Sequence, residues 1–261
     1  MKATLDGVAI EYEARGDGPA VLLLHAFPLG LFMWDAQVEA LSATHRVVRF
    51  DARGFGGSAA GEGPLTMERI ADDGAALLDH LGIEKAVVGG CSMGGYAAFA
   101  FVRRHPQRLA GLVLQDTRAG ADTAEAKANR STLAAKVLAE GASAAEEAFL
   151  PKLVGETTHR ERPALVAGLR ERILATSPQA IANALHGLAA RADSRETLPT
   201  IAVPTLVLVG SEDVLTPASE AAMMAAAIPR ARLDVIPGAG HLANLEDPVA
   251  VNAALRAFLV R

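Results

Sequence analysis

The stretch GGCSMGGY, residues 89–96, places a cysteine and a serine side by side among four glycines. A short apolar run precedes it and a segment with helical spacing follows, so the stretch lies where a buried strand gives way to a helix. Residues 90–94 fit the pattern G-x-S-x-G, which sets a serine in a sharp strand-to-helix turn. Centring the pattern on Cys91 would require glycine at position 93, which is methionine. The register therefore predicts Ser92 as a nucleophile and Cys91 as a small buried side chain.

Strand-like and helix-like segments alternate on both sides of this turn. Apolar runs too short for helices occur at residues 20–24, 47–50, 86–90, 109–114, 205–210 and 233–236. Helical spacing occurs at residues 34–41, 67–81 and 93–105, and Asp247-Pro248 starts a terminal helix. Asp6-Gly7 between two polar-apolar runs predicts an opening hairpin. This order predicts a doubly wound α/β fold with a mostly parallel sheet.

Residues 118–198 interrupt the alternation. The strand signal disappears there, and Ala, Leu, Glu and Arg recur at helical spacing, with breaks expected near Gly141, Pro151, Gly155 and Pro178. We therefore expect a core of residues 1–117 and 199–261 and a helical insertion of residues 118–198. The insertion has eleven basic and ten acidic residues, a balance that predicts no single sign of charge facing a substrate.

Composition excludes several classes of protein. The net charge is −5 without a basic block, so neither nucleic acid nor a membrane is an expected partner. No apolar run approaches the length of a membrane span, and the N-terminal residues lack the apolar core of a secretory signal, so a cytoplasmic protein is expected. A single cysteine excludes an intramolecular disulfide. No helix pairs histidines with a carboxylate at ligand spacing, so neither a metal nor a cofactor is expected, and the sequence leaves the oligomeric state open.

A serine nucleophile needs a histidine base and an acid that orients it. Among seven histidines, His241 lies in a flexible Gly-Ala-Gly-His turn beyond the last expected strand. Asp213 follows a buried strand by three residues and is the predicted acid, with Asp116 as an alternative after another strand. The resulting chain order, Ser, Asp, His, is that of hydrolases built on such a sheet. The acidic pair Glu246 and Asp247 is interpreted as the start of a helix.

Two backbone N–H groups should stabilise the negative charge that develops on a carbonyl oxygen during attack. Met93 supplies one because it follows the nucleophile at the start of a helix. Phe27 supplies the other from the loop after an early strand, since Pro28 has no N–H. The segment from Gly54 to Ala59 formally matches a dinucleotide fingerprint, but turn residues follow it where that fingerprint requires a helix.

With these residues assembled, the sequence resembles the α/β-hydrolase superfamily, in the branch of small capped bacterial carboxylesterases and 3-oxoadipate enol-lactonase-like hydrolases. The motifs are an oxyanion loop at residues 25–28, a D-x-R-G-x-G-x-S segment at 51–58, the serine turn at 90–94, an acid loop at 210–217 and a histidine loop at 238–248. Ala26 departs from the usual glycine and could tilt the peptide that carries the Phe27 donor. The resemblance implies that residues 118–198 form a cap over the site.

The resemblance limits the reactions to be considered. Serine at position 92 argues against the reactions of relatives whose nucleophile is aspartate or cysteine. The predicted function is hydrolysis of a small carboxylic ester or lactone through an acyl-serine intermediate. Cleavage of a C–C bond, thioester hydrolysis and hydroxynitrile lysis use the same catalytic groups and remain alternatives. A ligand-binding receptor that keeps these residues without turnover is an alternative from a different class.

Overall fold

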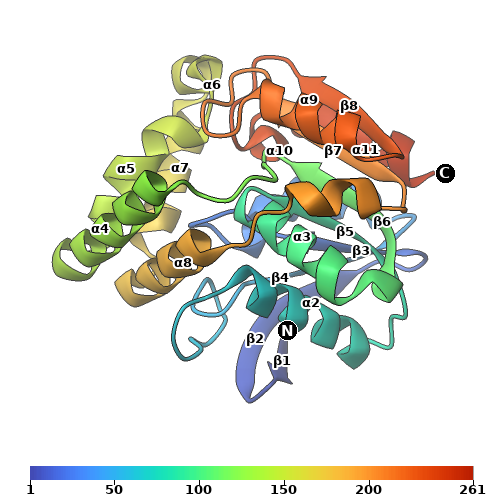
Figure 1. The fold of residues 1–261 in the computed structure, drawn as a ribbon, viewed down its shortest axis with the longest axis horizontal. Helices are drawn as coiled ribbons and strands as arrows, with labels where there is room; N and C mark the ends of the chain where they lie inside the picture. The colour runs from blue at the N-terminus through green and yellow to red at the C-terminus, as the bar shows by residue number, and fades with distance from the viewer. Residues whose placement is uncertain (261) are drawn as a thin grey trace.

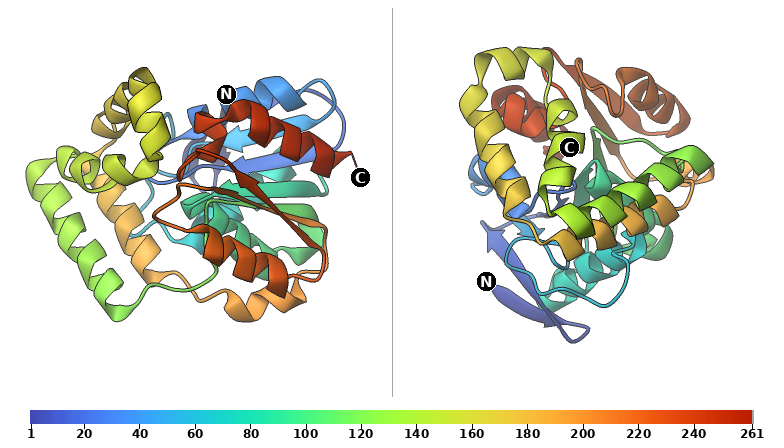
Figure 2. Two further views of the ribbon diagram at one scale, coloured as in Figure 1. Left: turned by 90° about the horizontal axis from the view of Figure 1, so that it is seen from above. Right: turned by 90° about the vertical axis from the view of Figure 1, so that its left-hand side faces the viewer.

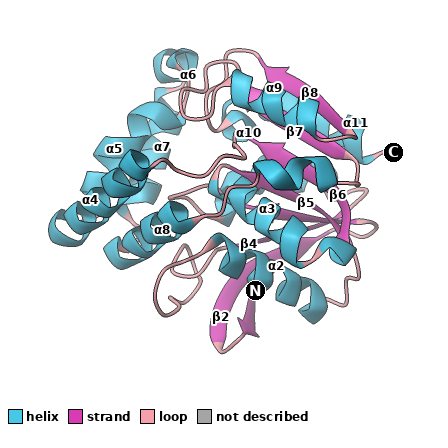
Figure 3. Ribbon diagram, in the orientation of Figure 1, coloured by secondary structure: helices cyan, strands magenta, loops and turns pink. Residues whose placement is uncertain are grey.

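The computed structural model describes residues 1–260 and has an eight-stranded sheet with helices on both faces (Figures 1 and 3). The strand order is β1-β2-β4-β3-β5-β6-β7-β8, and only the pairings of β1 with β2 and of β2 with β4 are antiparallel. The strands are β1 (Lys2–Leu5), β2 (Val8–Arg15), β3 (Ala20–Leu24), β4 (Arg46–Phe50), β5 (Ala86–Cys91), β6 (Leu109–Gln115), β7 (Thr205–Gly210) and β8 (Ala231–Ile236). The predicted doubly wound sheet is confirmed.

Helices that follow the strands cover the sheet. They are α1 (Asp35–Leu41), α2 (Met67–His80), α3 (Met93–Arg104), α9 (Ala218–Ala227), α10 (Ala243–Glu246) and α11 (Pro248–Leu259), with short 3-10 turns at Leu31–Trp34, Pro106–Arg108 and Arg195–Thr200. Side-chain caps start two of these helices: the Thr66 hydroxyl accepts from Arg69 N, and the Asp247 carboxylate, predicted to start the last helix, accepts from Ala250 N. The opening hairpin also forms, with positive φ at Asp6 (46°) and Gly7 (75°) as its two-residue turn requires.

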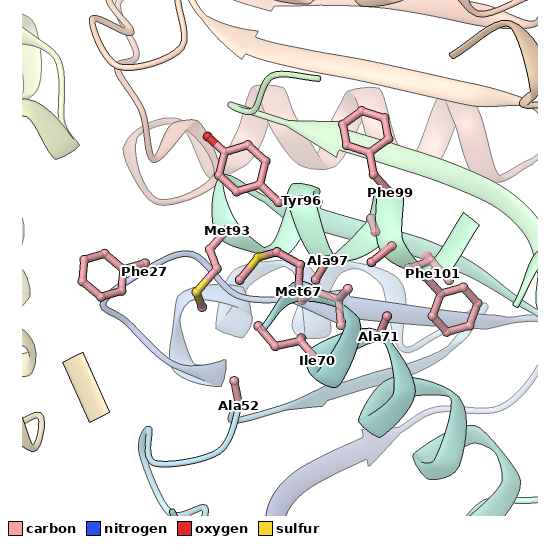
Figure 4. Close-up of a cluster of buried hydrophobic side chains, with 14 of the residues drawn as sticks. Phe27, Ala52, Met67, Ile70, Ala71, Met93, Tyr96, Ala97, Phe99 and Phe101 are labelled. Carbon is pink, nitrogen blue, oxygen red and sulfur yellow. The ribbon is translucent and has the colours of Figure 1, made fainter. Parts of the chain in front are cut away.

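Successive residues of the central strand β3 belong to different cores. Leu22 and Leu24 point toward α2 and α3, whereas Val21 and Leu23 pack with α1 and α11 on the other face. Because both faces of a parallel sheet are covered, its strands read as continuous apolar runs. Figure 4 shows the first core, where Met67 and Ile70 of α2 meet Met93 and Ala97 of α3.

Five helices lie between β6 and β7: α4 (Ala124–Glu140), α5 (Ser143–Leu153), α6 (Glu156–Glu161), α7 (Pro163–Leu174) and α8 (Pro178–Ala190). We call them the helical segment. Figures 1 and 2 show that they stand beyond one end of the sheet and cover neither face. The nearest strand ends are the carboxyl ends, because residues just after β5, β7 and β8 share a cavity with residues of α4, α5 and α8.

Two details of this segment differ from expectation. Pro151 does not break α5, which continues to Leu153; its ring lies in the last turn, where a missing N–H costs one helical hydrogen bond. An additional break separates α6 from α7, where Pro163 occupies the first position of α7. A proline in the first turn of a helix marks its start, whereas a proline in the last turn can leave the helix intact. The sequence pattern alone did not distinguish these two positions.

Candidate active site

Ser92 occupies a strained turn between β5 and α3, with φ 53° and ψ −111°. Residues other than glycine rarely adopt these backbone angles, and those that do cluster at functional sites. The flanking glycines make the turn possible: a Cβ on Gly90 would lie 2.1 Å from the carbonyl oxygen of Gly94, and a Cβ on Gly94 would lie 2.1 Å from that of Leu24. The G-x-S-x-G pattern is therefore a steric requirement of this turn.

The three residues predicted as nucleophile, base and acid come together in the structure. The Nε2 atom of His241 lies 2.8 Å from Ser92 Oγ, and its Nδ1 atom lies 2.9 Å from Asp213 Oδ2. Since a carboxylate can only accept, Nδ1 carries the proton and Nε2 accepts from the serine hydroxyl. His241 and Asp213 are buried, at 2% and 4% exposure. The arrangement can move the serine proton onto the imidazole during attack.

Four hydrogen bonds fix the Asp213 carboxylate. Oδ1 accepts from the backbone N–H groups of Leu215 (2.8 Å) and Thr216 (2.9 Å), and Oδ2 accepts from the Thr216 hydroxyl at 2.6 Å in addition to His241. Burial alone would raise the pKa of Asp213, but the hydrogen bonds from His241 and Thr216 outweigh it and hold the pKa below its ordinary value. The carboxylate therefore stays ionised beneath the imidazole.

Asp116, the alternative acid, makes different contacts. Its carboxylate accepts from Gly210 N at 2.8 Å and from Ala243 N at 3.2 Å, and it makes no hydrogen bond to His241 among the described residues. Asp116 is fully buried, and burial together with the charge of Asp213 raises its pKa well above the ordinary value. The geometry therefore assigns Asp116 to the junction of the acid and histidine loops.

Cys91 points away from the cavity. Its side chain is fully buried in the second core, where Gln115 Nε2 lies 3.6 Å from the sulfur. Burial, and after it the charge of Asp116, raises the pKa of the thiol well above its usual value, so the nucleophilic thiolate is suppressed. These surroundings match a buried filler residue.

A cavity of about 90 Å³ opens over Ser92. Phe27 and Met93, the predicted donors to a carbonyl oxygen, both line it. Met93 begins α3, and the first N–H groups of a helix have no partner within it. The cavity is smaller than the roughly 300–1,000 Å³ of drug-sized ligand sites.

Sequence reasoning did not single out Arg118, Leu153 and Leu188 of the opposite wall of this cavity. Phe149 and Leu153 of α5 and Leu188 of α8 line it, and so do Arg118 and Arg130. Periodicity did not distinguish these residues from ordinary core and surface positions. The prediction that no single sign of charge faces the substrate is also wrong. The insertion contributes two charged side chains to the cavity lining, and both are arginines.

The two arginines share one buried carboxylate, Asp122. Its oxygens lie 3.0 Å from an Nη atom of Arg118, 2.5 Å from Nε of Arg130 and 2.7 Å from an Nη atom of Arg191. Burial would raise the pKa of Asp122, but Arg130 and Arg191 outweigh it and lower that pKa. Three permanent positive charges thus surround one negative charge, which leaves an excess of positive charge beside the cavity.

His25 and the segment from Gly54 to Ala59 lie in loops of the sheet end and make contacts that stabilise the fold. His25 Nε2 accepts from Ala52 N of the loop after β4 (2.9 Å), and its Nδ1 lies 2.9 Å from Ala26 O of its own loop; burial lowers its pKa. Turn residues follow Gly54–Ala59 and the next helix starts at Met67, so the segment lacks the helix that a dinucleotide fingerprint requires directly after it. Within residues 1–260, no three His, Cys, Asp or Glu side chains group as metal ligands, and no helix is both long and apolar enough for a membrane span.

The chain belongs to the α/β-hydrolase fold family, whose sequence model matches residues 19–248. This match confirms the family expected from the motifs, and the fold with it.

Known members of the family resemble the chain over nearly its full length. 3-Oxoadipate enol-lactonase 2 of Acinetobacter baylyi is 29% identical, over 99% of this chain and 96% of that protein. The malate-bound structure of a thermophilic esterase from Thermogutta terrifontis aligns with a TM-score of 0.96 and 45% identity, covering 100% of this chain and 97% of that one. The enol-lactonase from Burkholderia xenovorans LB400 aligns with a TM-score of 0.93 and 31% identity, over 100% of both chains. These similarities support a hydrolase of the esterase or lactonase type.

Proposed function

We propose that the protein is a serine hydrolase that cleaves a small carboxylic ester or lactone through an acyl-Ser92 intermediate. The observation that carries the proposal is the continuous hydrogen-bonded relay from Ser92 Oγ through His241 to Asp213 at the strained turn after β5. The similarity to an esterase and to enol-lactonases supports the same reaction class. The chemistry needs no group beyond the chain and water.

The reaction proceeds in two halves. Ser92 Oγ attacks the acyl carbon and its proton passes to His241 Nε2, while the N–H groups of Phe27 and Met93 hold the oxyanion. Collapse of this intermediate breaks the bond to the alcohol oxygen, which takes the proton from His241 and leaves. His241 then removes a proton from water, the hydroxide attacks the acyl carbon, and the proton returns to Ser92 as the acid is released.

We further propose that residues 118–198 act as a cap and that residues 1–117 and 199–261 form the core. The core supplies the reacting groups, and the helical segment supplies the facing wall with Arg130, Phe149, Leu153 and Leu188. Because this wall closes a small cavity, the cap limits the size of the acyl group.

The excess positive charge around Asp122 indicates a substrate that carries a carboxylate as well as its ester or lactone bond. Arg118 and Arg130 both line the cavity, and Asp122 satisfies only part of their donors. A substrate carboxylate would gain charge-assisted hydrogen bonds from the same two groups. The enol-lactonase relatives make a lactone a fitting member of this class.

A substrate panel tests the proposed function. Nitrophenyl esters with neutral and with carboxylate-terminated acyl chains, a lactone, an acyl thioester and a β-diketone are compared by kcat/KM. The proposal predicts fastest turnover of a short carboxylate-bearing ester or a lactone. Preference for the thioester or diketone would contradict it, and binding with about one turnover or none would indicate a receptor.

A further inference from the structure

Residues 154–157, which comprise the connection after α5 and the first two residues of α6, lie against the two loops that carry Asp213 and His241. Gly155 N donates to Glu246 Oε2 at 2.8 Å, and Thr157 N donates to Glu212 Oε2 at 2.9 Å. Neither glutamate serves the relay itself. Each one joins the helical segment to a loop of the sheet that carries a reacting group.

Glu246 bridges the helical segment and the histidine loop with a single buried carboxylate. Its exposure is 8%, and while Oε2 accepts from Gly155, Oε1 accepts from Leu242 N at 3.1 Å. Leu242 directly follows His241 in the chain. The position of the imidazole is therefore tied to the position of Gly155 through two hydrogen bonds.

Glu212 makes the corresponding bridge for the acid loop. It directly precedes Asp213, and its Oε1 accepts from the Thr157 hydroxyl at 2.6 Å in addition to the backbone bond. The hydrogen bonds from Thr157 hold the pKa of Glu212 below its ordinary value, so it acts as a charged acceptor. Its own N–H donates to Ala239 O at 2.8 Å, which joins the acid loop to the histidine loop.

The backbones of the connection and of the histidine loop also pack closely where Gly155 meets Gly240. A Cβ on Gly240 would lie 2.2 Å from Gly155 N, and a Cβ on Gly155 would lie 2.4 Å from Glu212 Oε2. Arg162 adds a further bond between the two regions, because its Nη1 donates to Leu245 O at 2.9 Å. Only glycines permit this approach, so a shift of the connection must move the two loops or break these bonds.

The connection also leads directly to the substrate cavity. Leu153, the last residue of α5, lines the cavity, and so does Phe149, whose ring meets that of Phe27 at a centroid distance of 5.1 Å. A ligand that presses on this end of α5 acts on the residues that precede Gly155. Residues 153–155 therefore both line the cavity, through Leu153, and connect to the loop of His241, through Gly155.

We propose that Glu212 and Glu246 are positioning residues that couple the docked helical segment to the placement of Asp213 and His241. The proposal rests on the proposed function for its kinetic consequence. Docking of residues 154–157 holds the relay in register, and loss of either glutamate bridge lets the imidazole shift from Ser92. A small misplacement of a reacting group is sufficient to lower turnover by about 100-fold.

The test compares the isosteric variants Glu212→Gln and Glu246→Gln with Glu146→Gln as a matched control. Glu146 is a carboxylate of α5 that pairs with Arg170 and contacts neither loop. Each glutamine variant should lower kcat by about 10–100-fold with KM changed less than about threefold, while the control keeps wild-type values. Hydrogen exchange of residues 237–247 should be faster in both bridge variants and unchanged in the control.

Thr157→Val is the milder variant, since it deletes one donor to Glu212 and keeps the backbone bond. It should lower kcat by less than Glu212→Gln, and the double variant should lose less than the product of the two separate losses, because both remove the same hydrogen bond. Multiplicative losses would overturn the coupling through Thr157.

Two results would overturn the proposal as a whole. One is a lower melting temperature with kcat and loop exchange unchanged, which would mean that the glutamates stabilise the fold only. The other is equal exchange in all variants and wild type. Should wild type hydrolyse no ester at all, the proposed function fails, and the exchange comparison still decides whether the bridges hold the loops.

Discussion

The strand-end loops and the helical segment form facing walls of one cavity, but different interactions hold their side chains in place. At the strand ends, backbone geometry and short loops fix Ser92, Asp213 and His241, and glycines make the close approaches possible. At the opposite wall, ion pairs with the buried Asp122 hold the two charged lining side chains, Arg118 and Arg130. We infer that the first wall determines the reaction and the second determines which substrates undergo it.

The largest expected effect is at the strand-end wall. Ser92→Ala removes the proposed nucleophile and should reduce kcat by about 10⁶ for every substrate. The measurement is turnover of a nitrophenyl ester, with the melting temperature as a check on folding. A loss that differs strongly between substrates would contradict the division between the two walls.

Asp213→Asn should reduce kcat by about 10⁴, because the amide can leave the imidazole in the wrong tautomer. The pH profile supplies a second check. Since the folded pKa of Asp213 is lowered, the carboxylate is ionised at all pH values above its ordinary pKa of about 3.9 and is protonated only as pH falls through the lower folded value. Any acid limb of kcat/KM above about pH 4 therefore belongs to a group other than Asp213.

Arg130→Gln tests the opposite wall. It should raise KM by about 10–100-fold for a carboxylate-terminated ester, since a hydrogen bond to a charged group is worth about 1.5–3 kcal/mol, and leave neutral esters within about threefold.

Arg170→Gln is the matched control for this variant, because Arg170 belongs to the same segment, is 60% exposed and pairs with Glu146. Equal effects of Arg130→Gln on charged and neutral esters would mean that the arginine only packs the wall.

The smallest expected effect is at Cys91. Cys91→Ala should keep activity within about threefold and cost about 1 kcal/mol of stability as a small core truncation. Because the thiol pKa is raised, a thiol reagent at neutral pH should label Cys91 only on unfolding. Rapid labelling of the native protein together with loss of activity would return Cys91 to consideration as the nucleophile.

The same contrast explains what the sequence could predict. The turn at Ser92, the loops of Asp213 and His241 and the order of strands were readable because each depends on residues adjacent in the chain. The cluster of Arg118, Asp122 and Arg130 was not, since packing of the helical segment brings its charges around one cavity.

Glu246 shows a related limit. Its place before the terminal helix suggested a role at a helix start, but its side chain turns to Gly155, 91 residues away in the chain. The break predicted at Pro151 was wrong for a local reason. The sequence does not reveal whether a proline lies in the last turn of a helix or at the start of the next helix.

The most direct test of an activated serine is mass spectrometry of the intact protein and its peptides after exposure to a fluorophosphonate, with Ser92→Ala as the control. A single adduct on Ser92, absent from the control, is the predicted result and would establish that this hydroxyl is activated. An unlabelled wild-type protein, or an adduct on Cys91, would contradict it.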